Sequence, residues 1–155
     1  MAILTCTRLM AVERLLLALW VGGICVVGYL VTPILFATLT DDRQLAGMLA
    51  GKMFSAISWA GLVIGTLLFV ASIVAAGGQW LRQWRCWLLI SMLLVVVLML
   101  FVIQPMMADL KLQGPVVKGS ELAAEFRRLH GLSSGLYLLM SLSGLTLVAT
   151  GLRRS

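Results

Sequence analysis

Charged residues are scarce in this chain, and their scarcity decides what kind of protein it is. Asp, Glu, Lys and Arg make up 12% of the 155 residues, whereas 61% are hydrophobic and the mean hydropathy is +1.06. A soluble domain carries about a quarter charged residues, and so short a chain has too little interior to bury the excess apolar surface. The excess must face lipid, which predicts one membrane domain over residues 1–155.

Cysteine is also rare and is not arranged to bind metal. The three cysteines are Cys6, Cys25 and Cys86, and no CxxC pair is present. Neither a structural zinc site nor a disulfide framework is expected. The net charge of +6 does not indicate nucleic acid as a partner, because the basic residues stand at the ends of apolar runs, where they meet lipid headgroups.

Four segments are long enough to cross a bilayer, which takes roughly 20 apolar helical residues. They cover residues 15–37, 53–77, 86–107 and 121–152, and the last begins with an amphipathic stretch that Ser120 can cap. No Asp, Glu, Lys or Arg lies within their apolar parts. We therefore expect an all-α, integral membrane four-helix bundle. Gly114-Pro115 predicts a turn in the longest loop.

Arginines suggest the orientation of the bundle. One side carries six of them against Glu13 alone; they are Arg8, Arg14, Arg82, Arg85, Arg153 and Arg154. The other side has equally many Lys and Arg residues, but these are mixed with acidic residues. Arginine concentrated in a short turn and beside the first helix favours both termini on the cytoplasmic side.

Small residues predict how the helices pack, because membrane helices associate where their backbones can approach closely. Gly22 and Gly23 mark the first helix, and Gly61 and Gly65 form a GxxxG spacing in the second. That spacing could be used inside the monomer or between two copies. The third helix has no glycine, so we expect it at the periphery. Pro33 should kink the first helix.

Polar residues gather near the outer ends of the four helices, opposite the termini. Six residues form this predicted cluster: His130, Gln104, Ser133, Tyr137, Thr32 and Ser58. His130 is expected to point toward the bundle because it shares a helical face with Tyr137. The cluster is either a hydrogen-bonded network between helices or a small-molecule or metal site.

An enzyme is not expected. The spans contain no carboxylate that could drive ion-coupled transport, and no acid is placed to orient His130 as a catalytic base. No cofactor is expected either, but an alternative remains. His130 with Met106 and Met107 would suit Cu(I), and His130 could also ligate haem.

The chain resembles the transmembrane-protein-205-like family, which is also known as domain of unknown function 4149. Phe126-Arg-Arg-Leu-His130-Gly-Leu-Ser-Ser134 resembles the family's F-x-x-L-H-G-x-S-S stretch, and Trp20-Val-Gly22 with Pro33-Ile-Leu-Phe36 is similar to its W-x-G and P-x-L-F elements. Leu45-Ala-Gly47 to Phe54 and Gln104-Pro105 also fit. The resemblance implies a four-helix protein of the bacterial inner membrane without an established biochemical activity.

These observations lead to two functional hypotheses. The first is a non-enzymatic multi-pass protein of the inner membrane, acting as an interaction subunit or as a handler of small solutes or metals. Its partners would be the lipid bilayer and a second copy or another membrane protein. The alternative is a haem- or copper-binding redox protein that uses His130.

Overall fold

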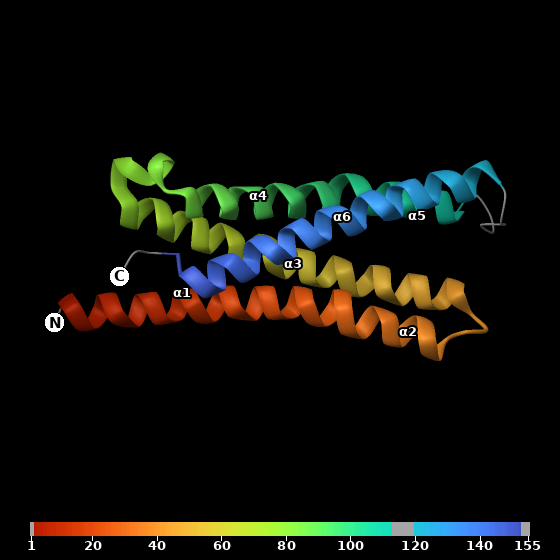
Figure 1. Ribbon diagram of the computed structural model, residues 1–155, viewed down its shortest axis with the longest axis horizontal. Coiled ribbons are helices and arrows are strands. Elements are labelled where there is room, and N and C mark those ends of the chain that lie inside the picture. The colour runs from red at the N-terminus through yellow and green to blue at the C-terminus, as the bar shows by residue number, and fades with distance from the viewer. Residues whose placement is uncertain (1, 113–119, 153–155) are drawn as a thin grey trace.

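A computed structural model shows an antiparallel bundle of long helices (Figure 1). It describes residues 2–112 and 120–152. The elements are α1 (Ala2–Cys25), the π-helix η1 (Val26–Val31), α2 (Thr32–Thr38), α3 (Arg43–Ala76), the 3-10 helix η2 (Gly77–Arg82), α4 (Trp84–Leu98), the π-helix η3 (Met99–Ile103), α5 (Gln104–Leu112) and α6 (Glu121–Thr150). The turn predicted at Gly114-Pro115, together with Lys118, Arg153 and Arg154, lies outside the described residues.

The four predicted membrane spans are confirmed. Helical segments long and apolar enough to cross a membrane cover Arg8–Thr38, Arg43–Arg82, Trp84–Leu110 and Glu121–Thr150. The second begins ten residues before the predicted boundary at 53, because the Asp42 side chain caps it by accepting a hydrogen bond from the Leu45 N–H at 2.8 Å. The cap predicted at Ser120 is confirmed, with Ala123 N–H donating to Ser120 Oγ at 3.2 Å.

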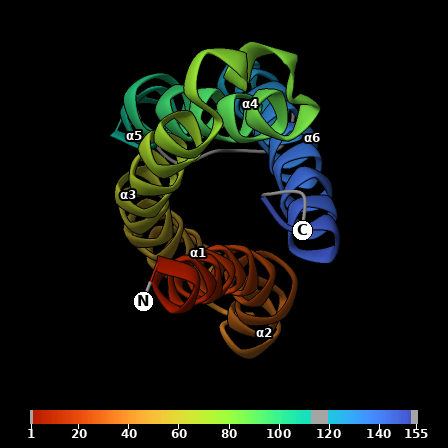
Figure 2. The ribbon, with the colours of Figure 1, turned by 90° about the vertical axis from the view of Figure 1, so that its left-hand side faces the viewer.

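The spans form a ring in which each packs against two neighbours (Figure 2). The order around the ring is α1, α3, α4 and α6, and α6 closes it by packing on α1. The start of α1 and the end of α6 lie at one end of the bundle (Figure 1). The end of α2 and the start of α3, like the end of α5 and the start of α6, lie at the opposite end, which we call the outer end; the first is the terminal end.

The third span is not peripheral, and that prediction is wrong. The apolar window of its segment is 44% buried, compared with 22–28% for the other three. Its bulky side chains fill the hollows that glycines leave on neighbouring helices. A Cβ added at Gly65 would lie 2.7 Å from Leu93 Cδ2, and one at Gly144 would lie 3.1 Å from Met92 Cε. A helix without glycine can therefore occupy the core when its neighbours supply the small residues.

Trp20 makes the tightest of these contacts with glycine. Its indole is 1% exposed and lies on α3, where a Cβ at Gly61 would overlap indole Nε1 and one at Gly65 would lie 2.9 Å from Cη2. The Gly61/Gly65 spacing is thus used inside the monomer. Gly23 also packs, because a Cβ added there would lie only 2.5 Å from Ile57 Cδ1. The prediction for Gly22 is wrong, because Gly22 is exposed with no atom within 4 Å of a Cβ placed there.

Both membrane prolines follow a π turn. The Thr32 N–H, just before Pro33, donates to Val27 O, and the Gln104 N–H, just before Pro105, donates to Met99 O. Each bond reaches back five residues rather than four. Proline has no N–H, and its ring clashes with the carbonyl of residue i−4, so the wider turn lets the chain pass without ending the span. At Pro33, where a kink was predicted, the structure shows a change of helix type from π to α.

The contact of Trp20 with α3 predicts opposite effects for two glycine substitutions. Gly61→Ala should lower the free energy of unfolding by about 1–3 kcal/mol, because the rigid, buried indole cannot move aside. Gly22→Ala should leave it unchanged or raise it by up to about 1 kcal/mol through helix propensity. Titration of the purified protein from mild detergent into SDS, followed by circular dichroism, measures both. Equal effects of the two substitutions would contradict this packing.

Candidate functional site

His130 does not point into the bundle. Its side chain is exposed, and its ring stacks on that of Phe126 one turn earlier, with centroids 6.2 Å apart and planes 5° apart. The predicted orientation is wrong because a seven-residue spacing drifts by about 20° per heptad and α6 crosses its neighbours obliquely (Figure 1). The helical face that buries Tyr137 therefore no longer includes His130.

The other members of the predicted cluster are satisfied locally or lie apart. Thr32 Oγ1 donates to Val27 O at 2.7 Å, and Ser133 Oγ donates to His130 O at 2.8 Å, so each hydroxyl bonds within its own span. Ser58 is buried and Gln104 is half-buried. Within residues 2–112 and 120–152, no hydrogen bond joins the side chains of two cluster members. The structure does not bring the six together as one site.

Tyr137 belongs instead to a network that sequence reasoning did not find. Its hydroxyl donates to Ile24 O at 2.6 Å, next to the π turn η1. Tyr29 Oη donates to Ser141 Oγ at 3.1 Å, and Ser141 Oγ donates to Tyr137 O at 2.8 Å. These bonds join α6 to the first span at two points. We call this set of residues the tyrosine network.

Close packing surrounds the tyrosine network. A Cβ at Gly28 would overlap a ring carbon of Tyr137, so the glycine admits the aromatic ring. Phe54 meets Tyr137 edge to face at a centroid distance of 5.0 Å, and Tyr29 does so at 6.2 Å. A tyrosine in an apolar run needs a partner for its hydroxyl, and that need was the signal available in the sequence. The network ties helices together.

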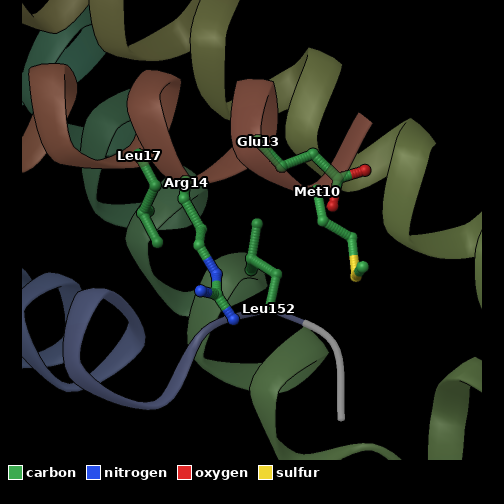
Figure 3. A pocket seen from close by; sticks show the side chains of 5 residues that line it. All are labelled: Met10, Glu13, Arg14, Leu17 and Leu152. Atoms are coloured by element: carbon green, nitrogen blue, oxygen red, sulfur yellow. The ribbon is translucent and has the colours of Figure 1, made fainter. Parts of the chain in front are cut away.

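A buried carboxylate lies at the terminal end. Glu13 of α1 is 5% exposed and lines a cavity of about 10 Å³ together with Met10, Arg14, Leu17 and Leu152 (Figure 3). Such a volume is close to what one water molecule needs. Figure 3 shows the Arg14 side chain reaching toward Leu152, just beyond α6. The expectation of an uncharged interior fails here, because the first span begins at Arg8 rather than at residue 15.

Helix geometry gives the separation of His130 and Arg14 along the bundle. Val21 of α1 packs on Gly144 of α6, so these two residues lie at one level. At 1.5 Å per residue, His130 lies about 21 Å from that level toward the outer end, and Arg14 lies about 10 Å from it toward the terminal end. Their separation of roughly 31 Å matches a hydrocarbon core. His130 and Arg14 are therefore separated along the bundle by about the thickness of a hydrocarbon core.

Tryptophans and an arginine gather at the start of α4, at the terminal end. Trp84 and Trp87 are exposed at the start of α4, and Trp87 Nε1 donates to Leu81 O at 2.9 Å. The Arg85 guanidinium lies 5.4 Å from the centre of the Trp84 ring. Tryptophan and arginine are typical of the headgroup region. The start of α4 thus has the residues typical of a membrane interface.

The haem or copper hypothesis gains no support from this arrangement. His130 and Met106 are exposed, and Met107 is only half-buried. In the part of the chain that the structure describes, no three His, Cys, Asp or Glu side chains are grouped so that they could hold a metal ion.

The fold and the composition define a multi-pass membrane protein with four spans. The family described as "Domain of unknown function (DUF4149)" matches residues 15–115, which is more than half of the chain. The chain belongs to that family, as its motifs suggested. No curated protein and no solved structure matches it.

The tyrosine network predicts which hydroxyl stabilises the bundle. Tyr137→Phe should lower the free energy of unfolding by about 0.6–1.7 kcal/mol, because it removes the bond to Ile24 O from a buried position. Tyr29→Phe also removes one hydroxyl, but from a half-exposed ring, and should lower the free energy of unfolding by less. His130→Ala should change the free energy of unfolding by less than about 0.5 kcal/mol. If His130→Ala destabilises the protein most of the three in an SDS titration, the tyrosine network is not the main polar interaction that stabilises the bundle.

Proposed function

We propose that the protein is a non-enzymatic interaction subunit of the bacterial inner membrane that binds another transmembrane helix along one face of α6. The observation that carries the proposal is a GxxxG spacing on that face. Gly131 and Gly135 are both exposed, and a Cβ at either would have no atom within 4 Å. These glycines therefore have no packing role inside the monomer.

Glycine inside a helix needs a compensating contact. It is about 1 kcal/mol less favourable than alanine there, and for Gly61 and Gly65 the contact with Trp20 supplies the compensation. At Gly131 and Gly135 a partner outside the monomer can supply it. GxxxG lets two membrane helices approach until their backbones touch, which is how such helices gain dispersion energy in lipid.

The surrounding residues form a surface suited to a helix. Ser134 lies between the two glycines, and Leu138 and Leu142 continue the face toward the terminal end; all three are exposed. Ser134 Oγ donates to His130 O at 2.8 Å, so its hydroxyl is already satisfied as it faces lipid. We call Gly131, Ser134, Gly135, Leu138 and Leu142 the α6 face. The polar groups of the tyrosine network hold α6 against the first span inside the monomer. Such an internal connection is what a structural scaffold needs.

A photocrosslinking experiment tests the α6 face. With benzoylphenylalanine at Leu138, irradiation of membranes should give an adduct with a protein, whereas the same residue at Val63, which is exposed on α3, should not. Gly135→Leu should abolish the adduct by preventing close approach. Gly22→Leu, at an exposed glycine of α1, is the matched control and should preserve it.

The mass of the adduct identifies the partner. An adduct of twice the mass of the chain means a second copy, and any other protein mass means a different membrane protein. If Leu138 gives no protein adduct, or if Gly135→Leu leaves the adduct intact, the α6 face is not a protein-binding surface.

We also propose that both termini lie in the cytoplasm. The described part of the terminal end carries Arg8, Arg14, Arg82 and Arg85 against Glu13, while the other five acidic residues of the chain lie toward the outer end. Concentrated arginine beside short connections favours the cytoplasmic side. A C-terminal fusion to green fluorescent protein should fluoresce, and a fusion to alkaline phosphatase should be inactive. The reverse result would invert the orientation.

A further inference from the structure

Two arginines lie at the outer end of the α6 face. Arg127 and Arg128 are the last charged residues before the apolar part of α6, and no Asp, Glu, Lys or Arg follows them up to residue 150. Both side chains are exposed. In the described part of the chain, neither guanidinium has a hydrogen bond or an ion pair. Both positive charges are therefore available to a partner.

Helix geometry places these arginines on either side of the α6 face. At about 100° per residue, Arg127 lies about 40° from Gly131 in one direction, and Arg128 lies about 60° from it in the other. Ala124 and Gly131 lie between the two arginines, one turn before and one turn after them, and both are exposed. The two guanidiniums thus border a strip of small residues that a side chain of a partner helix can enter.

The side of the membrane on which these charges lie favours a protein carboxylate as their partner. With both termini in the cytoplasm, as proposed above, Arg127 and Arg128 lie on the opposite side, where arginine beside a span is less common. The surface potential that attracts basic segments to anionic lipid belongs chiefly to the cytoplasmic leaflet. A carboxylate can pair with guanidinium groups through charge-assisted hydrogen bonds in a bidentate arrangement.

A second copy of this chain does not supply that carboxylate. In a two-fold pair that crosses at Gly131 and Gly135, the arginines of both copies would lie at one level and repel each other. The nearest acidic residue on α6 is Glu125, which lies about 120° around the helix from Gly131. Glu125 is therefore on a different side of α6 from the surface that would meet the second copy.

We propose that the helix bound at the α6 face belongs to a different membrane protein and carries an acidic side chain that pairs with Arg127 and Arg128. This inference rests on the binding of a helix there, as proposed above. Small residues of the partner would meet Gly131 and Gly135. Its carboxylate would lie about 5–6 Å further out, because three or four residues of helical rise separate the arginines from Gly131. The partner should therefore have Asp or Glu three or four positions from a small residue, on the outer side.

Crosslinking to synthetic helices tests the charge pairing. The full chain, with benzoylphenylalanine at Leu138, is reconstituted in phosphatidylcholine vesicles with a fluorescent, leucine-rich transmembrane peptide. The peptide contains a GxxxG spacing and a glutamate three residues before its first glycine. It should give about fivefold more adduct than the same peptide with glutamine, because an exposed ion pair contributes up to about that factor. Combining Arg127→Gln with Arg128→Gln should remove the difference.

Matched variants separate this pairing from other causes. Arg127→Glu combined with Arg128→Glu should reverse the preference, so that a peptide with lysine in place of glutamate gives the most adduct. Arg43→Gln combined with Lys52→Gln removes the same charge from exposed residues of α3 at the outer end and should leave the preference unchanged. Circular dichroism and size-exclusion chromatography establish that each variant is folded.

The same experiment distinguishes failure of this inference from failure of the α6 face. If both peptides give equal adducts that Gly135→Leu abolishes, a helix binds at the α6 face but the arginines do not select it. If phosphatidylglycerol in the vesicles removes the preference for glutamate, the arginines bind lipid headgroups instead. An adduct of twice the chain mass in native membranes means a second copy and also contradicts the inference. If no peptide and no protein forms an adduct, both proposals are wrong.

Discussion

The contact of Trp20 with the backbone of α3 is the constraint on which the rest of the bundle depends. Lipid tails are as apolar as leucine, so burial from water cannot hold membrane helices together, and dispersion contacts at close range must do so. An indole ring reaches such range only where its neighbour has no side chain, as at Gly61 and Gly65. Once α1 and α3 are fixed in this way, Leu93 of α4 packs on the same glycine, Gly65.

The same logic explains the position of α6. Val21 and Met92 converge on Gly144 from two different helices, so one small residue closes the ring. Tyr137 adds a directional bond one or two turns away, and Gly28 makes room for its ring. Packing sets the distance between the helices, and the hydrogen bond fixes how far one can slide along the other. These contacts leave Gly131 and Gly135 unexplained within the monomer.

Composition and local signals predicted the spans and the cap at Ser120, but not the mutual orientation of the helices. Ser120 could be recognised because capping depends on adjacent residues. Asp42 was not identified as a cap, and the second span was predicted to begin ten residues too late. The orientation of His130 depends on the crossing angle of α6, which no local pattern contains. The third span was wrongly predicted to be peripheral, because only helices that carry glycine were expected to pack closely. The space beside a glycine must, however, be filled by a side chain of a neighbouring helix, such as Leu93. The buried position of Glu13 was missed because the first span was assumed to begin after the last charged residue near the N-terminus.

Each π turn holds one more residue than the α-helical turn it replaces. The spans that contain Pro33 and Pro105 therefore behave as continuous helices with a single inserted residue. One extra residue rotates everything beyond it by about 100° around the helix axis. The outer quarter of each span can thus present a different side to its neighbours than the inner part does, and the two parts of one helix obey separate sequence patterns. The first and third spans share this insertion, and in the sequence a proline marks it in each.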